Sequence, residues 1–304
     1  PTHPPTPHIT PHVLSSAASD VYKRQRMAYG APRDLLLGLR YIDSKGVLVT
    51  AGGRVVKNVA GYDMTRLLTG SAGTLGFISE ATWRVSTIPQ RCAAITAVGA
   101  LDTCAATALE IVQSVLSPIY VTCRPAGQPA AGTVSDDWEI VVGFEGFSQT
   151  VDYQMEKCGT VLETAGLHSL KRADYPVHDG RFGDEFGEMG QSPFILRADF
   201  PLDRVAGFIG ALDDRPALSK VFLDFGCGRL LAGLDDMGDD DWTRLCERIG
   251  QHNGHGLLVK APDDFRKRND VFGTPRPEWK VMHRIKAAMD PDNIFSPGCL
   301  PGRV

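Results

Sequence analysis

The chain has 304 residues, of which 43% are hydrophobic and 22% are charged, and its formal net charge is −4. This is an ordinary globular composition, and the length allows one large domain or two moderate ones. The mild negative charge argues against nucleic acid as the main partner, and the longest apolar runs are too short to span a bilayer. We therefore expect a folded protein with no nucleic-acid partner and no membrane span.

The first 25 residues differ from the rest of the chain. Residues 1–12 are rich in proline, histidine and threonine and have no periodic apolar face, which is typical of a disordered tail. Residues 15–25 (SSAASDVYKRQ) resemble, residue for residue, one reading frame of a common transposase sequencing adapter. We therefore expect residues 1–25 to be a non-native or disordered leader. The alternative is a metal-binding tract formed by the three histidines of this segment.

From Met27 onward the pattern indicates regular structure. Residues 34–53 are typical of two strands joined by a turn at residues 44–46. Apolar residues at helical spacing predict a short helix within residues 62–71 that ends at a glycine. Residues 74–89 alternate as expected for a strand that ends at a proline. The glycines of this region are therefore predicted to lie in loops around a short helix.

Residues 92 to about 265 follow a different pattern, in which strands and helices alternate and hairpins recur. This pattern favours an antiparallel sheet with helices on one face. The expected strands cover residues 92–101, 118–125, 138–146, 193–201, 220–234 (a hairpin) and 255–262. The expected helices cover residues 102–116, 150–166, 202–212 and 239–254. An amphipathic helix within residues 278–298, ended by an Asp-Pro pair, closes the chain.

The seven cysteines are widely and irregularly spaced, and no Cys-x-x-Cys occurs. Because an iron–sulfur cluster or a structural zinc site needs closely spaced thiolates, we expect no metal site. An odd, scattered count is typical of reduced thiols in the cytoplasm. His252 and His255 lie three residues apart, but a surface turn followed by a strand explains this spacing better than a metal site does.

Six glycines fall between Gly52 and Gly76, without a Walker lysine and without Gly-x-Gly-x-x-Gly. Glycines in loops allow backbone N–H groups to approach a ligand that a Cβ atom would exclude. Such loops suit phosphates, flat rings or adenine edges. The alternative is that these glycines only make tight turns and close strand packing, and spacing alone leaves both interpretations open.

Residues 55–82 (VVKNVAGYDMTRLLTGSAGTLGFISEAT) resemble the second half of the FAD-binding, PCMH-type domain of the vanillyl-alcohol-oxidase-like flavoproteins. More narrowly, they are similar to the FAD-binding subunit of glycolate oxidase, also called glycolate dehydrogenase. Later segments resemble motifs of that family in the same order, so that the resemblance runs from about Met27 to Gly298. These segments are residues 194–201, 223–231, 254–262 and 285–298.

The resemblance implies an α+β fold with two parts. Residues 26–90 would form a partial PCMH-type FAD-binding lobe, and residues 91–265 a cap domain with an antiparallel sheet and helices. Residues 266–304 would be a C-terminal helix and tail that return to the lobe.

The resemblance also implies that FAD lies against the glycine stretch. Asp63 precedes a predicted helix and is interpreted as its cap rather than as a ligand contact. Lys57 is either a cation near the pyrophosphate or an edge-strand residue. The implied cofactor-binding residues are Asn58, Gly61, Tyr62, Gly70, Ser71, Gly73, Thr74, Leu75, Gly76 and Phe77.

Three departures from the family bear on function. The Gly-rich pyrophosphate loop of the family's N-terminal half has no counterpart before Met27, so we expect an N-terminally truncated chain with poor affinity for FAD. Ser296 stands where the closing motif usually has asparagine, so no amide contact is expected from the tail. The His-x-Gly-Asp-Gly-Asn-x-His metal motif of related D-2-hydroxy acid enzymes is absent, which places substrate oxidation mainly on a partner subunit.

These features imply the FAD-binding subunit of a glycolate oxidase complex, in which a small 2-hydroxy acid gives hydride to the flavin. The implied partners are a second flavin subunit and an iron–sulfur subunit, in the cytoplasm or, through these partners, at the periphery of the inner membrane. Arg197 and His255 are candidates for binding the substrate carboxylate or for proton transfer, although Arg197 could instead pair with Asp199.

Two alternatives stay open. One is a standalone FAD-dependent oxidase or dehydrogenase of the same superfamily. The other is a non-catalytic scaffold subunit, with an interface formed by the apolar segments 208–212 and 230–234.

Overall fold

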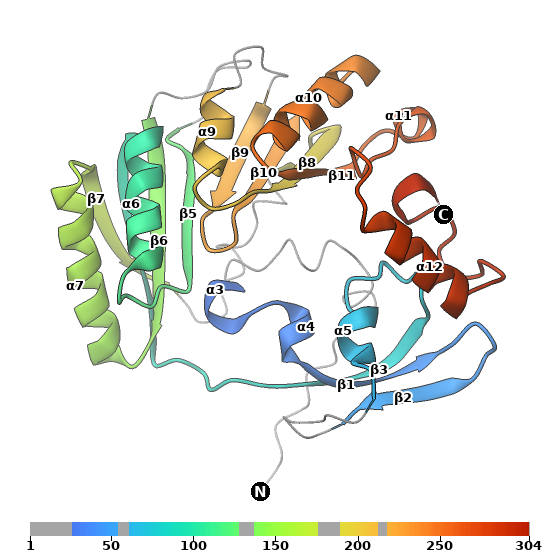
Figure 1. The fold of residues 1–304 in the computed structure, drawn as a ribbon. Helices are drawn as coiled ribbons and strands as arrows, with labels where there is room; N and C mark the ends of the chain where they lie inside the picture. The colour runs from blue at the N-terminus through green and yellow to red at the C-terminus, as the bar shows by residue number, and fades with distance from the viewer. Residues whose placement is uncertain (1–25, 54–60, 128–136, 176–188, 212–217, 304) are drawn as a thin grey trace, which may run out of the picture. The chain divides into compact units, whose positions relative to one another are not determined.

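The computed structural model describes residues 26–53, 61–127, 137–175, 189–211 and 218–303. The chain divides into two compact units (Figure 1). Within the described residues, the boundaries lie between Tyr29 and Gly30, between Val85 and Ser86 and between Pro275 and Arg276; the sequence predicted the last two at 90/91 and 265/266. The first unit therefore combines a segment near the start of the described chain with its C-terminal helix and tail.

The first unit contains a three-stranded antiparallel sheet of strand order β2–β1–β3. Strands β1 (Leu36–Ile42) and β2 (Leu48–Gly52) form the hairpin that the sequence predicts. In its turn, the Asp43 carboxylate accepts hydrogen bonds from the amides of Lys45 and Val47, each at 2.9 Å. Strand β3 (Phe77–Trp83) pairs with the other edge of β1 and ends at Trp83 rather than at Pro89.

Helices from both ends of the described chain complete this unit. They are α4 (Pro32–Leu35), α5 (Met64–Leu68), α12 (Trp279–Met289) and the short 3₁₀ helix η2 (Pro301–Arg303). The core of the unit contains Leu39 and Tyr41 of β1 and Leu68 of α5, and Ile285 and Met289 of α12 pack against it. The small sheet therefore buries one of its faces against elements that lie more than 200 residues apart in the sequence.

The second unit contains an eight-stranded sheet in which every paired strand is antiparallel. The strand order is β11–β8–β10–β9–β5–β6–β4–β7. This mixture of an antiparallel sheet and helices confirms the predicted α+β class. The strands are β4 (Arg91–Ala100), β5 (Tyr120–Pro125), β6 (Asp137–Gly146), β7 (His168–Asp174), β8 (Phe194–Asp199), β9 (Leu218–Asp224), β10 (Arg229–Leu234) and β11 (His255–Lys260).

Four helices cover one face of this sheet: α6 (Leu101–Gln113), α7 (Ser148–Thr164), α9 (Val205–Gly210) and α10 (Asp239–Gln251) (Figure 1). Two short helices, α3 (Arg26–Tyr29) and α11 (Asp263–Arg268), belong to the same unit. The helices and alternate strand residues share one large core that contains the fully buried Trp138 and Phe144. Among the described residues, no helix is long and apolar enough to cross a membrane.

Three described elements of the second unit were not predicted: α3, β7 and α11. Strand β7 is exposed along most of its length and has no apolar alternation, so its hydrogen bonds to β4 define it rather than its side chains. Helix α11 has only six residues, too few to show a periodic apolar face.

Most described residues of the apolar segments 208–212 and 230–234, which were predicted to form an exposed interface, lie in the core, so the prediction is wrong for these residues; Leu212 lies outside the described residues. Phe208 and Ile209 of α9 are buried against the sheet, and all six residues of β10 are buried. The physical reason is that β10 is a central strand between β8 and β9, and α9 covers this sheet. The scaffold hypothesis thereby loses the surface on which it depended.

A row of polar residues crosses the sheet face that lies opposite these helices. In register, His255 of β11 is opposite Asp199 of β8, and Asp199 is opposite Arg229 of β10. Arg229 is in turn opposite Asp224 of β9, and Asp224 is opposite Thr122 of β5. Arg229, Asp224 and Thr122 are buried, so this row brings charged groups into the interior of the unit.

Candidate functional site

The glycine stretch lies between α5 and β3 in the first unit. Asp63 precedes α5, and its carboxylate accepts a hydrogen bond from the amide of Arg66 at 3.1 Å, which confirms the predicted cap. Residues 70–76, called the glycine loop below, form the turn that leads from α5 into β3. Asn58 and Lys57 lie outside the described residues.

Backbone conformation and close packing account for the glycines of this region. Gly61, Gly70 and Gly73 have φ angles of 82°, 81° and 72°, in the left-handed region that favours glycine. A Cβ atom on Gly76 would lie 3.0 Å from a ring carbon of Tyr41, so this glycine permits close packing. A Cβ atom on Gly61 or Gly70 would meet no atom within 4 Å, so the backbone at these two positions is open.

Side chains in and beside the glycine loop point either into the core of the unit or toward solvent. Thr74 is fully buried and its hydroxyl donates to the Ser71 carbonyl at 2.7 Å, while Leu75 belongs to the core of the unit. The rings of Tyr62, before α5, and Phe77, the first residue of β3, are exposed to 94% and 55%. A ligand at this loop would therefore contact its backbone and exposed aromatic rings, but not the side chains of Thr74 and Leu75.

Ala72 is a residue of the glycine loop that the sequence analysis did not select. Its φ angle of 53° is unusual for alanine and indicates local strain. Within the described part of the chain, the amides of Ala72 and Gly73 have no hydrogen-bond acceptor. Open backbone donors beside a strained residue suit a ligand with carbonyl or phosphate oxygens.

A buried lysine of the C-terminal helix contacts the glycine loop from inside the unit. The ammonium group of Lys286 donates to the Thr74 carbonyl at 3.0 Å and to the Phe295 carbonyl at 2.7 Å, and it forms an ion pair with Asp290. The sequence motif of residues 285–298 includes Lys286, but no role was predicted for this residue. The sequence signal for this ion pair was a lysine four residues before an aspartate, on an otherwise apolar helix face.

Asp290 is held by several donors at the end of α12. Its two carboxylate oxygens accept the amides of Ile294 at 3.0 Å and Phe295 at 2.8 Å, in addition to the Lys286 ammonium. Burial alone would raise the pKa of Asp290, but these hydrogen bonds outweigh burial and lower the pKa below its ordinary value. Asp290 is therefore a carboxylate at neutral pH, and its charge compensates that of the buried lysine.

In the second unit, Arg197 and Arg229 share one carboxylate. The Nε and Nη2 atoms of Arg197 lie 3.0 and 2.9 Å from an oxygen of Asp199, as the sequence analysis considered. The Nε atom of Arg229 lies 2.6 Å from the other oxygen. The side chains of Arg197 and Arg229 are 19% and 7% exposed, so Arg197 is the arginine that a solute can reach.

The two predicted histidines lie in different surroundings. His255 is exposed at the start of β11, opposite Asp199 in register, so the sheet places it near Arg197. His252 packs edge-on against the ring of Phe208, with ring centres 5.8 Å apart. The described residues contain no group of three or more histidine, cysteine, aspartate or glutamate side chains that could hold a metal ion.

Comparison with known families identifies the C-terminal segment. Residues 273–300, which include α12 and the Lys286–Asp290 ion pair, match the family described as FAD linked oxidases, C-terminal domain. The C-terminal segment of the chain is therefore similar to the C-terminal domain of FAD-linked oxidases. This match agrees with the predicted cofactor, FAD, and with the predicted oxidoreductase class.

Several relatives match most of this chain. Glycolate oxidase subunit GlcD of Bacillus subtilis is 24% identical, over 90% of this chain and 64% of its own length. The mitochondrial D-lactate dehydrogenase [cytochrome] of Arabidopsis thaliana is 25% identical, over 90% of this chain and 53% of its own length. Glycolate oxidase subunit GlcE of Escherichia coli is 26% identical, over 88% of this chain and 66% of its own length. The chain therefore spans between about half and two thirds of the length of these relatives.

A solved structure shares the fold of this chain. An alkyldihydroxyacetonephosphate synthase superposes with a TM-score of 0.60 over 94% of this chain and 57% of its own length, at 15% sequence identity. The fold of the two proteins is therefore the same despite little sequence identity.

The first unit fits the flavin ring of FAD at the glycine loop. The ring has carbonyl acceptors and a flat face, and the loop region has the unpaired amides of Ala72 and Gly73 and the exposed rings of Tyr62 and Phe77. Gly61 and Gly70 leave room for close approach of a ligand to the backbone. The residues that would hold the ring are therefore backbone groups of residues 70–77 together with Tyr62.

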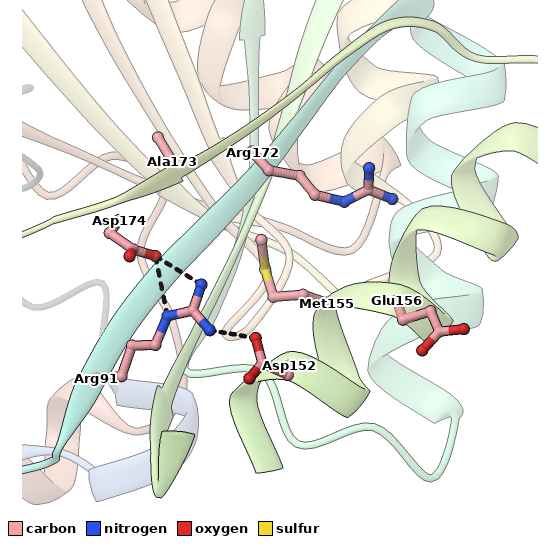
Figure 2. Close-up of a pocket in the computed structure, with 7 residues that line it drawn as sticks. All are labelled: Arg91, Asp152, Met155, Glu156, Arg172, Ala173 and Asp174. Atoms are coloured by element: carbon pink, nitrogen blue, oxygen red, sulfur yellow. Dashed lines mark hydrogen bonds and ion pairs between the residues drawn. The ribbon is translucent and has the colours of Figure 1, made fainter. Parts of the chain in front are cut away.

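A separate pocket of about 550 Å³ lies between β4, β7 and α7 of the second unit (Figure 2). Figure 2 shows Arg91 donating to both Asp174 and Asp152, so its charge is neutralised. Three carboxylates against two guanidinium groups leave a net charge of −1, which disfavours an acidic substrate. The pocket contains none of the predicted site residues. It is lined by Arg91, Asp152, Met155, Glu156, Arg172, Ala173 and Asp174.

Acid pH is expected to destabilise the second unit through Asp199. Burial alone would raise the pKa of Asp199, but the charges and hydrogen bonds of Arg197 and Arg229 outweigh burial and lower the pKa. The ion pairs therefore stabilise the fold fully above the unfolded-state pKa of about 3.9, and this contribution is lost as the pH falls through the lower folded-state value.

Urea unfolding of the wild type and of Asp199→Asn at about pH 7, 4 and 3 measures this contribution. The variant should be less stable at pH 7 and should lose less stability than the wild type between pH 4 and pH 3. Equal losses in the two proteins would show that Asp199 is not the responsible group.

Proposed function

We propose that this chain is related to the FAD-linked oxidases and takes part in the oxidation of a small 2-hydroxy acid, as the FAD-binding subunit of a glycolate oxidase-type complex. The named activities of its relatives, two glycolate oxidase subunits and a D-lactate dehydrogenase, support this substrate class. FAD, when bound, supplies the acceptor for the hydride of the hydroxy acid. In contrast to the sequence-based expectation that a partner subunit mainly oxidises the substrate, the proposal is that this chain's own residues bind and orient the cofactor and the acid.

The observation that carries the proposal is the environment of Arg197. A guanidinium group has five N–H donors, and Arg197 uses only its Nε and Nη2 atoms to hold Asp199. Its Nη1 atom has no acceptor among the described residues, and part of the side chain is exposed. Asp199 holds the guanidinium plane in place, and the free N–H edge is suited to donate hydrogen bonds to the carboxylate of a hydroxy acid.

His255 is the proposed proton-transfer residue beside this carboxylate site. Its side chain is exposed on the strand next to that of Arg197, and an imidazole ring can accept or donate a proton. A hydroxyl group next to the bound carboxylate of a short acid would lie within a few atoms of Arg197. Neighbouring positions on β8 and β11 therefore suit the two ends of such an acid.

The proposed partners are a second flavin subunit and an iron–sulfur subunit, in the cytoplasm or, through them, at the inner membrane. Matches to both GlcD and GlcE support a complex that contains two related subunits. All seven cysteines are free and five of them are buried, and their wide spacing in the sequence does not suggest the thiolate set of a cluster. An electron relay to an iron–sulfur acceptor would then belong to another chain.

A flavin titration of the full 304-residue chain tests the proposal. Binding to the chain should quench the fluorescence of FAD, and binding should saturate at roughly 10–100 μM FAD. This is the affinity expected when backbone donors and stacking hold mainly the ring. Glycolate or D-lactate, added without oxygen to the loaded protein, should bleach the flavin absorbance, whereas acetate should not. Absence of saturation up to about 1 mM FAD would contradict a flavin site in this chain.

A further inference from the structure

We propose that Lys286 is a positioning residue that holds the glycine loop in its ligand-binding conformation from inside the first unit. Flavin affinity would then depend on a side chain that the flavin does not touch. This inference rests on the proposed flavin site at the loop, and it adds a residue that lies more than 200 positions away in the sequence.

The first observation is the arrangement of acceptors around the Lys286 ammonium group. It is 2% exposed, and its contacts are the Thr74 carbonyl, the Asp290 carboxylate and the Phe295 carbonyl. A lysine ammonium has three N–H donors, so these three acceptors use all of them. The lysine therefore joins the glycine loop, the end of α12 and the C-terminal tail at a single atom.

The second observation is the strain of the segment that Lys286 holds. Thr74 directly follows Ala72 and Gly73, whose φ angles of 53° and 72° lie in the left-handed region. An alanine keeps such a conformation only when its surroundings restrain the backbone. The Thr74 hydroxyl and amide both bond back to the Ser71 carbonyl, so Lys286 supplies the restraint from outside the loop.

The third observation is that a buried ion pair is a poor means of stabilising a core. Burying an ammonium and a carboxylate is costly, and well-packed apolar residues of similar volume often stabilise a fold as well or better. An apolar side chain in the place of Lys286 has no N–H donor, so it could not bond to a carbonyl of the loop. The bond to Thr74 is what the charged pair provides and an apolar pair would not.

Three variants separate loop positioning from general stability. Lys286→Met removes the bond to Thr74 but leaves the Asp290 charge buried, so it also destabilises the fold. Lys286→Met combined with Asp290→Asn removes both charges and keeps one oxygen, which can accept the amide of Ile294 or of Phe295. Lys280→Met, an exposed lysine on the same helix, is the matched control.

The first measurement is hydrogen exchange of the loop amides in the ligand-free chain, together with thermal unfolding. The double variant should unfold at nearly the wild-type temperature, yet its amides between residues 72 and 76 should exchange about tenfold faster. Lys280→Met should match the wild type in both. Because no flavin is present, this result does not depend on the proposed function.

The second measurement is the FAD titration of the same proteins. The double variant should bind FAD about tenfold more weakly than the wild type and Lys280→Met, because the cofactor must first order the loop. Wild-type affinity in a stable double variant would overturn the inference, since Lys286 would then be only half of a structural ion pair. Unchanged exchange of the loop amides would overturn it as well. Failure of the wild type itself to bind FAD would instead contradict the proposed function.

Discussion

Replacement of Gly228 by alanine is expected to destabilise the second unit by about 4 kcal/mol. Gly228 lies in the turn between β9 and β10 with a φ angle of 65°, where a side chain is disfavoured. A Cβ atom at this position would lie 2.0 Å from the Phe200 carbonyl oxygen. The Phe200 amide also donates to the Gly228 carbonyl at 2.7 Å, so the two backbones cannot separate without losing that bond.

Urea unfolding followed by tryptophan fluorescence measures this effect, because Trp138 and Trp242 are buried in the second unit. Gly250→Ala is the matched control, since Gly250 is exposed in α10 and a Cβ atom there would meet nothing within 4 Å. This variant should be more stable than the wild type by about 0.5–1 kcal/mol, the difference in helix propensity. A loss of less than about 1 kcal/mol in Gly228→Ala would show that the hairpin turn is not rigid.

Replacement of Arg197 by leucine is expected to lower the second-order rate of flavin reduction by a 2-hydroxy acid about 100-fold. The free N–H edge of Arg197 is the proposed contact to the substrate carboxylate, and a leucine provides no donor. Asp199 keeps its hydrogen bond from Arg229, so the variant should still fold. The measurement is stopped-flow reduction of the FAD-loaded protein without oxygen.

A neutral alcohol of the same carbon skeleton distinguishes substrate binding from general damage. It lacks the carboxylate, so it should react equally slowly with the wild type and with Arg197→Leu. Arg172→Leu changes an exposed arginine of the separate acidic pocket and should leave the rate with the hydroxy acid unchanged. A wild-type rate in Arg197→Leu would contradict the proposed role of Arg197.

Most elements of the fold could be predicted from the sequence because their signals are local. The β1–β2 hairpin has a turn sequence between apolar strands, and α10 combines an acidic first turn with periodic apolar residues. Strand β7 could not be predicted in this way, because its pairing with β4 depends on the tertiary fold. The same reason explains why most described residues of the segments 208–212 and 230–234 were wrongly predicted to be exposed. Local apolarity does not show which strand becomes central.

The candidate site could be predicted less completely than the fold. The glycine loop was located from its composition and its resemblance to a flavoprotein family, and the cap role of Asp63 followed from its position before a helix. The contact between Lys286 and Thr74 could not be predicted, because it joins residues that only tertiary packing brings together. The second arginine beside Asp199 was missed for the same reason, since Arg229 reaches it across a strand pair.

The polar row across the large sheet has a consequence for how that sheet assembles. Strand β10 is otherwise a run of leucine, alanine and glycine, and such a run would tolerate several alignments with its neighbours. Arg229 stands between Asp199 on one side and Asp224 on the other, so a shift by two residues would place a leucine opposite each carboxylate. A shifted alignment would leave buried charges uncompensated, at a cost of several kcal/mol. The charges at the end of an apolar strand thus select a single alignment during folding.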